Sequence, residues 1–431
     1  MTVGYTVGWT APVIPKLQDP DQSPLPGSIT ENQMSFVGTI LYLGGVPGPY
    51  LTGYLANRKG RKPCLLLGGV VTAVGYIVLA TAINLLMMYI GRALVGFGVA
   101  IITVMTLVYL GEIASTNIRG ILLTGSGIFQ TFGTLLVYSI GPYVRYSLTG
   151  YIGAILAALY CFGIFFIPET PLGYILRDNE KAAKEVLQDL GRPNDLEEVK
   201  ILKDEEINKN IKDEWIKIFT IKSNRKALLI AVTLNVLQQS SGIIAVVFFT
   251  TTIFELAGSS IKPDIATIII GITQLLASFV APIFVERNGR RILLLLSTAF
   301  CCFALVILGL FFYLDEIDHS SVDNLKWLPL VSLICFFLSY DVGFSIIPVA
   351  LIGELFTSNV RSTGSAVTIT IGWLFGFGVT TGFGFFITIL GGHITFWMFS
   401  GVCALAFIFT LVYVPETKFK SFIEIQEMLS K

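Results

Sequence analysis

Two adjacent glutamines stand in the middle of a long apolar segment of the chain. Gln238 and Gln239 lie within residues 227–254, a run that carries no charged side chain. A run of this length can cross a bilayer as a helix, because a crossing needs about 20 residues. Polar groups in hydrocarbon are costly when they have no partner. The two amides must therefore face the interior of a helical bundle.

The residues that follow the glutamines weaken the helix at this depth. Ser240, Ser241 and Gly242 come next, and Gly costs about 1 kcal/mol relative to Ala in a helix interior. An interrupted helix with amides at mid-depth is how a transporter presents hydrogen bonds to a polar solute. Glutamines also join neighbouring membrane helices. This stretch alone leaves both roles open.

The composition assigns the chain to the integral membrane proteins. Hydrophobic residues make up 54% of its 431 residues and charged residues 13%, and the mean hydropathy is +0.75. Soluble domains carry about 25% charged residues. The net charge is zero, so no basic surface predicts a nucleic-acid partner. No nucleotide loop, nucleophile elbow or metal cluster predicts an enzyme, and we expect no cofactor.

Twelve apolar runs predict an all-α membrane protein with twelve transmembrane helices. The runs are 1–14, 34–56, 64–83, 85–110, 120–141, 147–167, 227–254, 264–285, 292–314, 327–353, 364–388 and 393–414. The first is too short to cross alone, so either part of that helix is missing or it starts abruptly at the membrane face. We expect two six-helix bundles over 1–167 and 227–414, linker helices over 168–226 and a tail over 415–431.

Basic residues orient these helices, because cytosolic loops carry an excess of Lys and Arg. The loops after the even-numbered runs, together with the tail, hold 24 of the 29 basic residues. The other five are Lys16, Arg92, Arg145, Lys262 and Lys326. We therefore expect the even-numbered loops and both termini in the cytosol. The acidic segment 315–323, which contains His319, is expected outside, with His319 as a solvated loop residue.

The segment 168–226 is the long polar stretch between the two sets of six runs. Apolar residues recur in it at helical spacing, namely Ile175, Leu176, Val186, Leu187 and Leu190. Asp195 followed by Glu198 resembles a capping box. The pattern predicts short amphipathic helices on the cytosolic face, with a disordered mixed-charge linker as the alternative.

Three motifs occur twice in the same order, which indicates one six-helix unit used twice. The basic loop 53–62 after the second run matches 286–291 after the eighth. Glu112 and Arg119 match Glu354 and Arg361, with the same spacing of seven residues. The Pro-Glu-Thr sequence at 168–170 matches the one at 415–417.

The repeated charges predict a gate on the cytosolic side. A glutamate at a helix end and an arginine seven residues later can reach the basic loop of a neighbouring helix. Such pairs can hold one state of a two-state body. Topology alone would explain the basic loops but not the paired glutamates. The expected gate residues are Arg58, Arg61, Glu112, Arg119, Glu286, Arg290, Glu354 and Arg361.

These motifs resemble the sugar porter family of the major facilitator superfamily. The matching segments are the two basic loops and residues 91–96, 109–114, 119–120, 168–171, 238–242 and 415–418. Residues 4–12 look most like the facilitated trehalose transporters of insects and their relatives. The resemblance covers nearly the whole chain. It implies two six-helix bundles that rock against each other and a central sugar site between them.

The resemblance also implies which residues bind the sugar. Matched by position, they are Gln130, Gln238, Gln239, Gln274 and Trp373. Other positions depart from the family pattern: Ile244, Gly372 and Gly376 replace asparagines, Val349 replaces a tryptophan, and Phe248 and Phe249 replace tyrosines. The carboxyl-terminal half of the site has therefore lost hydrogen-bonding groups. We expect the solute to be a sugar such as trehalose or a hexose, or a related polyol.

We expect facilitative uniport by alternating access. Thr6 stands where proton-coupled members of the family carry an acid, and the acids Glu112, Glu286, Glu354 and Asp341 are expected toward the ends of spans. The alternatives are a proton-coupled sugar symporter and a non-transporting sugar sensor. We expect a monomeric multi-pass protein of the plasma membrane, whose partners are the bilayer and a small sugar or polyol.

Overall fold

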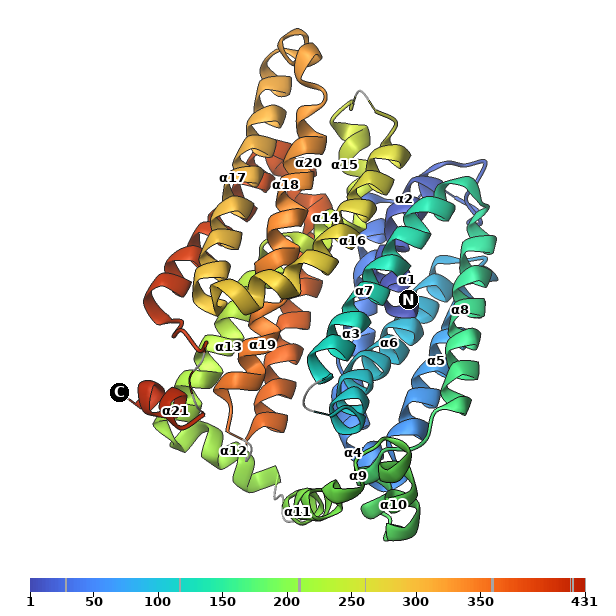
Figure 1. Cartoon of the computed structure of the whole chain (residues 1–431). Coiled ribbons are helices and arrows are strands. Elements are labelled where there is room, and N and C mark those ends of the chain that lie inside the picture. Colours follow the sequence, from blue (N-terminus) through green and yellow to red (C-terminus); the bar gives the residue numbers. More distant parts are fainter. Residues whose placement is uncertain are drawn as a thin grey trace.

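The computed structural model describes residues 1–27, 29–115, 118–207, 211–259, 261–357, 360–418, 420 and 422–430. Over these residues the chain forms helices and no strand. Figure 1 shows two groups of long helices side by side, blue to green and yellow to red, with shorter green helices at their lower end. The described part is therefore all-α, as the composition and the apolar runs predict.

The amino-terminal group contains the first eight helices. They are α1 (Thr2–Gly8), α2 (Thr10–Gln18), α3 (Glu31–Gly45), α4 (Gly48–Lys59), α5 (Arg61–Ala80), α6 (Leu85–Ile113), α7 (Arg119–Ile140) and α8 (Tyr146–Phe166), with the 3₁₀ turn Gly141–Tyr143 after α7. Side chains fix two of the helix starts. The Thr30 and Gln33 side chains cap α3 reciprocally, and Asn84 accepts the Met87 N–H at 2.8 Å to cap α6.

Short helices connect the two groups, as the spacing of apolar residues predicts. They are α9 (Pro171–Ile175), α10 (Glu180–Asp189), the 3₁₀ turn Pro193–Asp195, α11 (Leu196–Ile207) and α12 (Ile211–Thr220). Ile175, Leu187 and Val199 pack in a small core of their own. Asp195 directly precedes α11, but its carboxylate pairs with Arg192 at 2.6 Å. The Glu198 side chain, the other half of the expected capping box, lies outside the described residues.

The carboxyl-terminal group contains the remaining helices. They are α13 (Lys222–Ser240), α14 (Ile243–Phe248), α15 (Thr250–Leu256), α16 (Pro263–Asn288), α17 (Arg290–Ile317), α18 (Leu328–Ser339), α19 (Ile347–Leu355), α20 (Arg361–Tyr413) and α21 (Phe422–Ser430), with the 3₁₀ helix His319–Leu325 and the π-helix Tyr340–Phe344. His319 in that 3₁₀ helix is exposed and pairs with Asp315 at 2.9 Å.

The longest helix is two helices joined at a break. α20 has 53 residues, and Gly391 within it has φ 80° and ψ 164°, which are not helical angles. A straight helix of that length would extend ~80 Å, more than twice the ~30 Å thickness of a hydrocarbon core. Gly391 instead interrupts the helix and lets the chain change direction.

Nine helical segments of the described chain are long and apolar enough to cross a membrane. They are Arg61–Ala80, Leu85–Ile113, Gly120–Tyr143, Tyr146–Phe166, Lys222–Phe248, Pro263–Val285, Arg290–Ile317, Val322–Leu355 and Thr363–Tyr413. The last contains the break at Gly391. The first two expected runs are each divided, into α1 with α2 and α3 with α4. The count of twelve crossings therefore stays a prediction.

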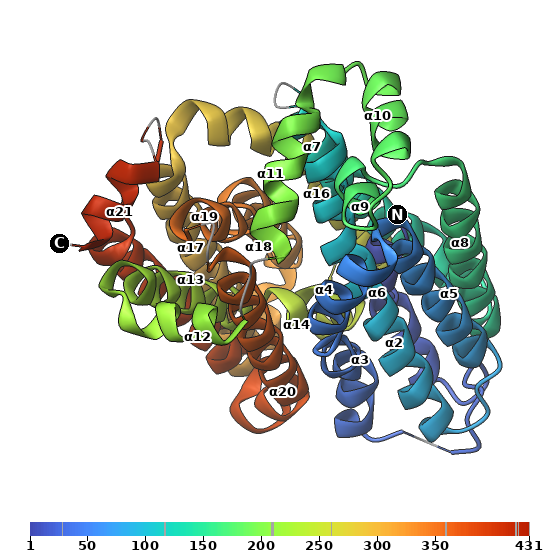
Figure 2. The same cartoon turned by 90° about the horizontal axis from the view of Figure 1, so that it is seen from below.

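Hydroxyl groups join the two groups of helices along their shared boundary. Four hydrogen bonds cross it: Tyr138 to the Val247 carbonyl at 3.1 Å, Thr381 to Thr39 at 2.9 Å, Thr131 to Ser278 at 3.1 Å, and Thr370 to Tyr50 at 3.1 Å. The Tyr42 and Phe248 rings also stack across it, with centroids 5.9 Å apart. The view from below in Figure 2 shows α3 and α7 on the amino-terminal side of this boundary.

Close backbone packing holds the amino-terminal group together at one glycine. A Cβ added to Gly96 of α6 would lie 2.0 Å from the Leu41 carbonyl oxygen of α3. Backbone atoms cannot yield as a flexible side chain can, so α3 and α6 approach this closely only because position 96 has no side chain. Small residues have this role at many membrane-helix interfaces.

We predict that Gly96→Ala destabilises the protein by about 1–3 kcal/mol, the usual cost of overpacking. The melting midpoint of the detergent-purified protein should fall by several degrees. Gly163→Ala is the matched control, because Gly163 is exposed on α8 and an added Cβ there meets no atom within 4 Å. Equal midpoints for the two variants would contradict this account of the α3–α6 contact.

Candidate solute site and charged network

The helix that carries the two glutamines is interrupted just beyond them. α13 ends at Ser240, and α14 begins after Gly242, whose φ is +83°. Residues with side chains are strained in this left-handed region, whereas Gly adopts it freely. The Ser241 hydroxyl donates to the Gln238 carbonyl at 2.7 Å, which satisfies an acceptor that the interruption exposes. The interruption therefore lies where the sequence predicts it.

The two glutamines have different surroundings, as expected for neighbours about 100° apart on a helix. Gln238 is buried, and its Nε2 donates to the carbonyls of Phe344 and Ser345 at 2.7 and 3.1 Å. Gln239 is half-buried and lies near Gly376 of α20. Within the described part of the chain, no hydrogen bond holds the Gln239 side chain. Gln238 thus joins two helices, while the Gln239 amide remains available to a solute.

The other expected site residues are spread over three helices. Gln274 of α16 is buried, and its Oε1 has no hydrogen-bond partner among the described residues. Trp373 of α20 is half-buried, with its ring 6.2 Å from that of Tyr42 in an edge-on arrangement. Gln130 of α7 is exposed. Trp373 therefore lies at the boundary between the two groups of helices, and no contact within the described chain joins it to Gln239 or Gln274.

Sequence reasoning missed one polar residue on the same helix. Asn235 is one turn before Gln238 and is buried, and its Oδ1 has no hydrogen-bond partner within the described chain. This oxygen lies against Gly372 of α20: an added Cβ there would be 1.7 Å away. The residue could have been found from its spacing of three from Gln238. The replacement of an expected asparagine by Gly372 leaves the room that the Asn235 amide occupies.

The structure corrects the expected position of Asp341. We expected this acid toward the end of its span, but it lies in the interior of the segment Val322–Leu355, in the π-helix Tyr340–Phe344. Its Oδ2 is buried without a hydrogen-bond partner among the described residues. π-Helical turns often occur at functional sites, and an acid within a membrane span is a functional candidate. The depth of Asp341 could have been predicted from the sequence, because residue 341 is near the middle of the run 327–353, but local sequence gives no signal for the π-helix.

Arg92 is one of the five basic residues outside the even-numbered loops, and it lies within the expected run 85–110. It is fully buried in α6, where its guanidinium donates to the carbonyls of Val37, Gly38 and Thr6 at 3.1, 3.1 and 3.4 Å. It also lies 4.9 Å from the centre of the Trp9 ring, a cation–π contact. Carbonyl dipoles and an aromatic ring thus surround this cation.

A cavity of about 310 Å³ lies between the two groups of helices, beyond the interruption. Apolar side chains form most of its wall, including Phe249 and Phe383. Gln18, Ser35 and Glu255 supply polar groups. Burial, and to a lesser degree Asp264, raises the pKa of Glu255. A mostly apolar cavity of this size with a few polar groups suits a small organic solute.

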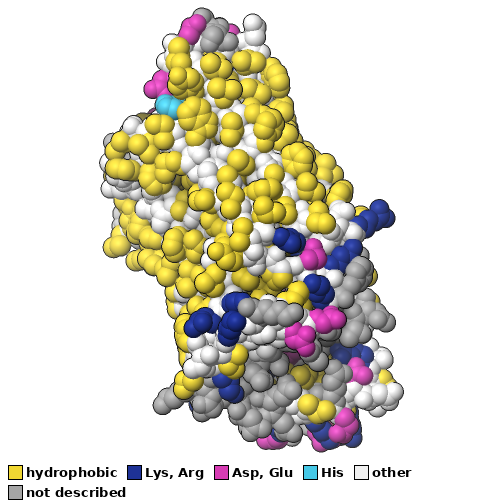
Figure 3. Space-filling view, turned by 90° about the vertical axis from the view of Figure 1, so that its left-hand side faces the viewer, with side chains coloured by type: hydrophobic (Ala, Val, Ile, Leu, Met, Phe, Trp, Pro, Cys, Tyr) yellow, Lys and Arg dark blue, Asp and Glu magenta, His cyan; other side chains and the backbone are white. Residues whose placement is uncertain are grey.

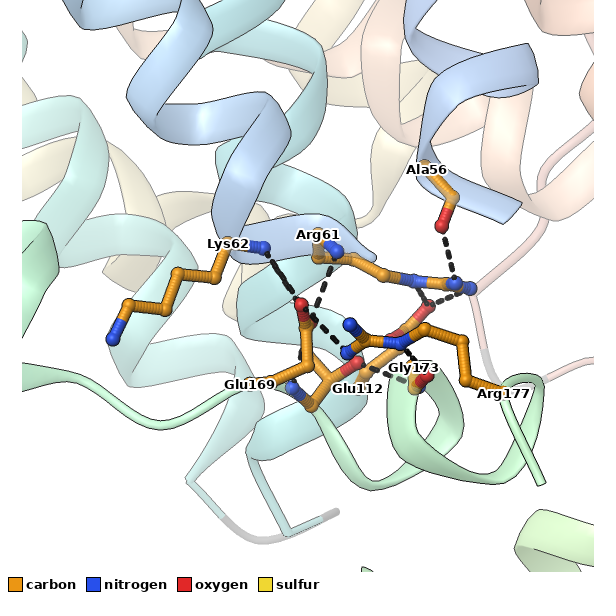
Figure 4. A network of polar contacts seen from close by, with 8 residues as sticks. Ala56, Arg61, Lys62, Glu112, Glu169, Gly173 and Arg177 are labelled. Carbon is orange, nitrogen blue, oxygen red and sulfur yellow. Dashed lines mark hydrogen bonds and ion pairs between the residues drawn. The ribbon is translucent and has the colours of Figure 1, made fainter. Parts of the chain in front are cut away.

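A charged network joins α5, α6 and the start of α9, and Figure 4 shows its residues pointing toward one another. Arg61 donates from Nη2 and Nε to Glu112 Oε1 at 2.9 and 3.0 Å. Glu169 accepts the backbone N–H of Arg61 at 2.9 Å and that of Lys62 at 3.2 Å. It also pairs with Arg177 at 3.3 Å. The Glu169 carboxylate thereby satisfies unpaired N–H groups in the first turn of α5.

The same arrangement occurs in the carboxyl-terminal group. Arg290 of α17 donates from Nη2 and Nε to Glu354 of α19 at 3.1 and 3.2 Å. Glu416 accepts the backbone N–H groups of Arg290 and Arg291, both at 3.1 Å. Thr417 donates to the second Glu354 oxygen at 2.5 Å. Each group of helices therefore has an arginine–glutamate pair. Each also has a second glutamate, far away in the sequence, whose carboxylate accepts N–H groups from the first turn of a helix.

Glu169 and Glu416 are members of the charged network that the sequence analysis did not single out, although their Pro-Glu-Thr motifs were recognised as repeats. Burial opposes ionisation of Glu416. The N–H groups of Lys418, Arg290 and Arg291 outweigh it and lower the pKa of this carboxyl. The repeated motif was the available signal in the sequence. It could not reveal that Glu169 contacts Arg61, which lies 108 residues away in the chain.

The structure brings together four of the eight expected gate residues: Arg61 with Glu112, and Arg290 with Glu354. Arg58 instead lies over the Tyr54 ring, 4.6 Å from its centre. The side chains of Arg119, Glu286 and Arg361 lie outside the described residues.

Sequence comparisons identify the family of the chain. The profile of the family described as "Sugar (and other) transporter" matches residues 2–429. Over its whole length the chain is 34% identical to the facilitated trehalose transporter Tret1 of Culex quinquefasciatus, of which it covers 83%. It is 34% identical to Tret1 of Polypedilum vanderplanki, of which it covers 85%. It is 33% identical to Tret1 of Anopheles gambiae and spans 54% of that protein.

Solved structures share the fold. The inward-open xylose transporter XylE from E. coli superposes with a TM-score of 0.81 at 21% identity, covering 99% of this chain and 96% of XylE. The proton:xylose symporter XylE bound to 6-bromo-6-deoxy-D-glucose gives 0.79 at 21% identity, covering 99% and 97%. Since the family profile matches nearly from end to end and whole-length relatives exceed 30% identity, the chain belongs to the sugar transporter family.

Proposed function

We propose that this protein carries a sugar, such as trehalose or a hexose, or a related polyol across the membrane by facilitated diffusion. The observation that carries the proposal is the interrupted helix α13–α14 in a chain of this family: the half-buried Gln239 amide just before the interruption has no hydrogen-bond partner among the described residues. The named relatives are facilitated trehalose transporters, which favours trehalose as the first solute to test.

The proposed transport cycle is alternating access at the boundary between the two groups of helices. Gln239, Gln274 and Trp373 would contact the solute, and the Arg61–Glu112 and Arg290–Glu354 pairs would fix helix ends on the side of the linker helices. In this proposal the chain crosses the membrane twelve times as a monomer, with both termini on the cytosolic side of the plasma membrane. The distribution of basic residues supports that orientation.

The direct experiment is uptake into liposomes that contain the purified protein, with a panel of labelled trehalose, hexoses and polyols. We expect at least one solute to enter faster than into protein-free liposomes and to stop at equal concentrations on both sides. Absence of uptake for the entire panel, with binding retained, would instead support a sugar sensor.

Proton-coupled symport is the second candidate, and Asp341 is the observation that favours it. A buried acid within a span can take up and release a proton during transport. Against it, Thr6 contributes no carboxylate near Arg92, whose guanidinium is already held by backbone carbonyls.

We predict that an imposed proton gradient does not drive accumulation, and that a protonophore leaves uptake unchanged. Asp341→Asn should likewise leave the equilibrium level unchanged, whatever its effect on rate. Accumulation that collapses with the protonophore and disappears in Asp341→Asn would overturn uniport and establish the second candidate.

We predict different consequences for the two glutamines. Gln239→Ala should weaken solute binding about three- to tenfold without changing the melting midpoint, since a hydrogen bond to a neutral partner contributes roughly 0.5–1.5 kcal/mol. Gln238→Ala should also lower the midpoint, because it removes the donor to the Phe344 and Ser345 carbonyls.

The measurements for this pair are a competition binding constant and thermal unfolding of the same preparations. Gln188→Ala on the exposed face of α10 is the matched control. Parental affinity in both Gln238→Ala and Gln239→Ala would mean that the amides only join helices, and the assigned site would be wrong.

We predict that Glu354→Gln shifts the protein toward its inward-open state. The substitution removes the negative charge that pairs with Arg290, a partly exposed ion pair worth on the order of 1 kcal/mol, or about fivefold in population. Ser35→Cys, in the wall of the 310 Å³ cavity, which we assign to the outer side, would report the shift as slower labelling by an impermeant maleimide, measured against the same background without this cysteine.

Glu112→Gln should act in the same direction, because the two pairs are equivalent by the internal repeat. Glu185→Gln, on the exposed face of α10, serves as the control. If Ser35→Cys is labelled at the same rate in the Glu354→Gln, Glu112→Gln and Glu185→Gln backgrounds, the two ion pairs have no role in gating.

A further inference from the structure

The short helix α12 has two faces of different character. Its inner face is fixed to the carboxyl-terminal group: Ile218 is fully buried, and Glu214 is 5% exposed and accepts a hydrogen bond from Thr363 of α20. The Asn224 side chain also donates to the Lys217 carbonyl at the end of the helix, at 3.3 Å. These contacts fix which way the opposite face points.

The opposite face presents large apolar side chains. Trp215, Ile216 and Phe219 are 39%, 59% and 55% exposed, and Ile221, just after the helix, is 45% exposed. The Trp215 and Phe219 rings stack one turn apart, with centroids 6.3 Å apart. A soluble surface rarely exposes such a row without an interaction partner.

The position of α12 next to a membrane span indicates what its apolar row contacts. Only Ile221 separates the end of α12 from α13, and the span Lys222–Phe248 begins at the first residue of that helix. Figures 1 and 2 show α12 crossing the lower end of the molecule at an angle to α13, at its edge. A helix that ends one residue before a membrane span lies at the depth of the lipid headgroups, so its outer apolar row meets the bilayer.

Basic residues flank this apolar row. Lys217, Lys222 and Arg225 are exposed, whereas the acid Glu214 is buried on the inner face. Figure 3 shows the wider pattern on this side of the molecule: hydrophobic side chains cover the upper part, and Lys and Arg side chains gather below them. An apolar row with cations beside it is the pattern of helices that lie in the membrane interface and bind anionic lipids.

We propose that α12 is an interfacial anchor that binds anionic lipid headgroups of the cytosolic leaflet. Trp215, Ile216 and Phe219 insert at the boundary of the acyl chains, and Lys217 and Arg225 contact the headgroup charge. The linker helix α10 differs, because its exposed residues include Lys181, Lys184 and Glu185, and Lys184 pairs with Glu180 at 3.7 Å. It therefore provides a charged cytosolic-side helix without the apolar row.

The test is quenching of Trp215 fluorescence by brominated lipids in nanodiscs of phosphatidylcholine. A minor fraction of the lipid is brominated phosphatidylserine in one sample and brominated phosphatidylcholine in the other. The chain has five tryptophans, so the Trp215 signal is the difference between the parent and Trp215→Phe. We expect Trp215 to be quenched several times more strongly by the brominated anionic lipid, since one cation near the surface favours it roughly fivefold.

The paired variant Lys217→Gln/Arg225→Gln should reduce quenching by brominated phosphatidylserine to the phosphatidylcholine level. Lys181→Gln/Lys184→Gln, on α10, should leave the preference intact, and high salt should weaken it. Equal quenching by the two lipids in the parent would mean an apolar contact without headgroup selection and would overturn the proposal. Absence of quenching by either lipid would place α12 in water and overturn it as well.

Discussion

Polar groups at the depth of the hydrocarbon must find partners inside the protein, and this constraint shapes the arrangement of both groups of helices. Arg92 meets it with three backbone carbonyls and the Trp9 ring. Gln238 meets it with two carbonyls beside the π-helix. These contacts hold helices of one group together, so the residues that carry them serve the scaffold.

A smaller set of polar atoms is not satisfied in this way. Gln274 Oε1, Asn235 Oδ1 and Asp341 Oδ2 are buried without hydrogen-bond partners among the described residues. Buried groups of this kind call for an explanation by water, an ion or a ligand. All three belong to the carboxyl-terminal group, where the sequence has lost the expected asparagines and tyrosines. We therefore propose that Asn235 beside Gly372 takes the place of an expected asparagine in this half.

Much of this architecture could be predicted from the sequence, and the features that could not be predicted have physical causes. Hydropathy predicted twelve runs, and nine helical segments of the described chain are long and apolar enough to cross a membrane, because burial in lipid imposes long apolar runs. The weak point at Gly242 and the repeated charge motifs were also readable, since they depend on residue type and spacing. The π-helix around Asp341 and the burial of Arg92 were not readable, because they depend on which neighbouring helix faces each residue. Glu169 and Glu416 act on helix starts 108 and 126 residues away, beyond any local pattern.

The central claim is that one solute site is exposed alternately to the two sides of the membrane. Counterflow in liposomes that contain the purified protein tests it most directly. Liposomes loaded with unlabelled solute are diluted into a trace of the labelled solute. An alternating-access carrier gives a transient accumulation of label above equilibrium, which decays as the unlabelled solute leaves. Label that rises to equilibrium without an overshoot, at a rate independent of internal solute, would contradict the account.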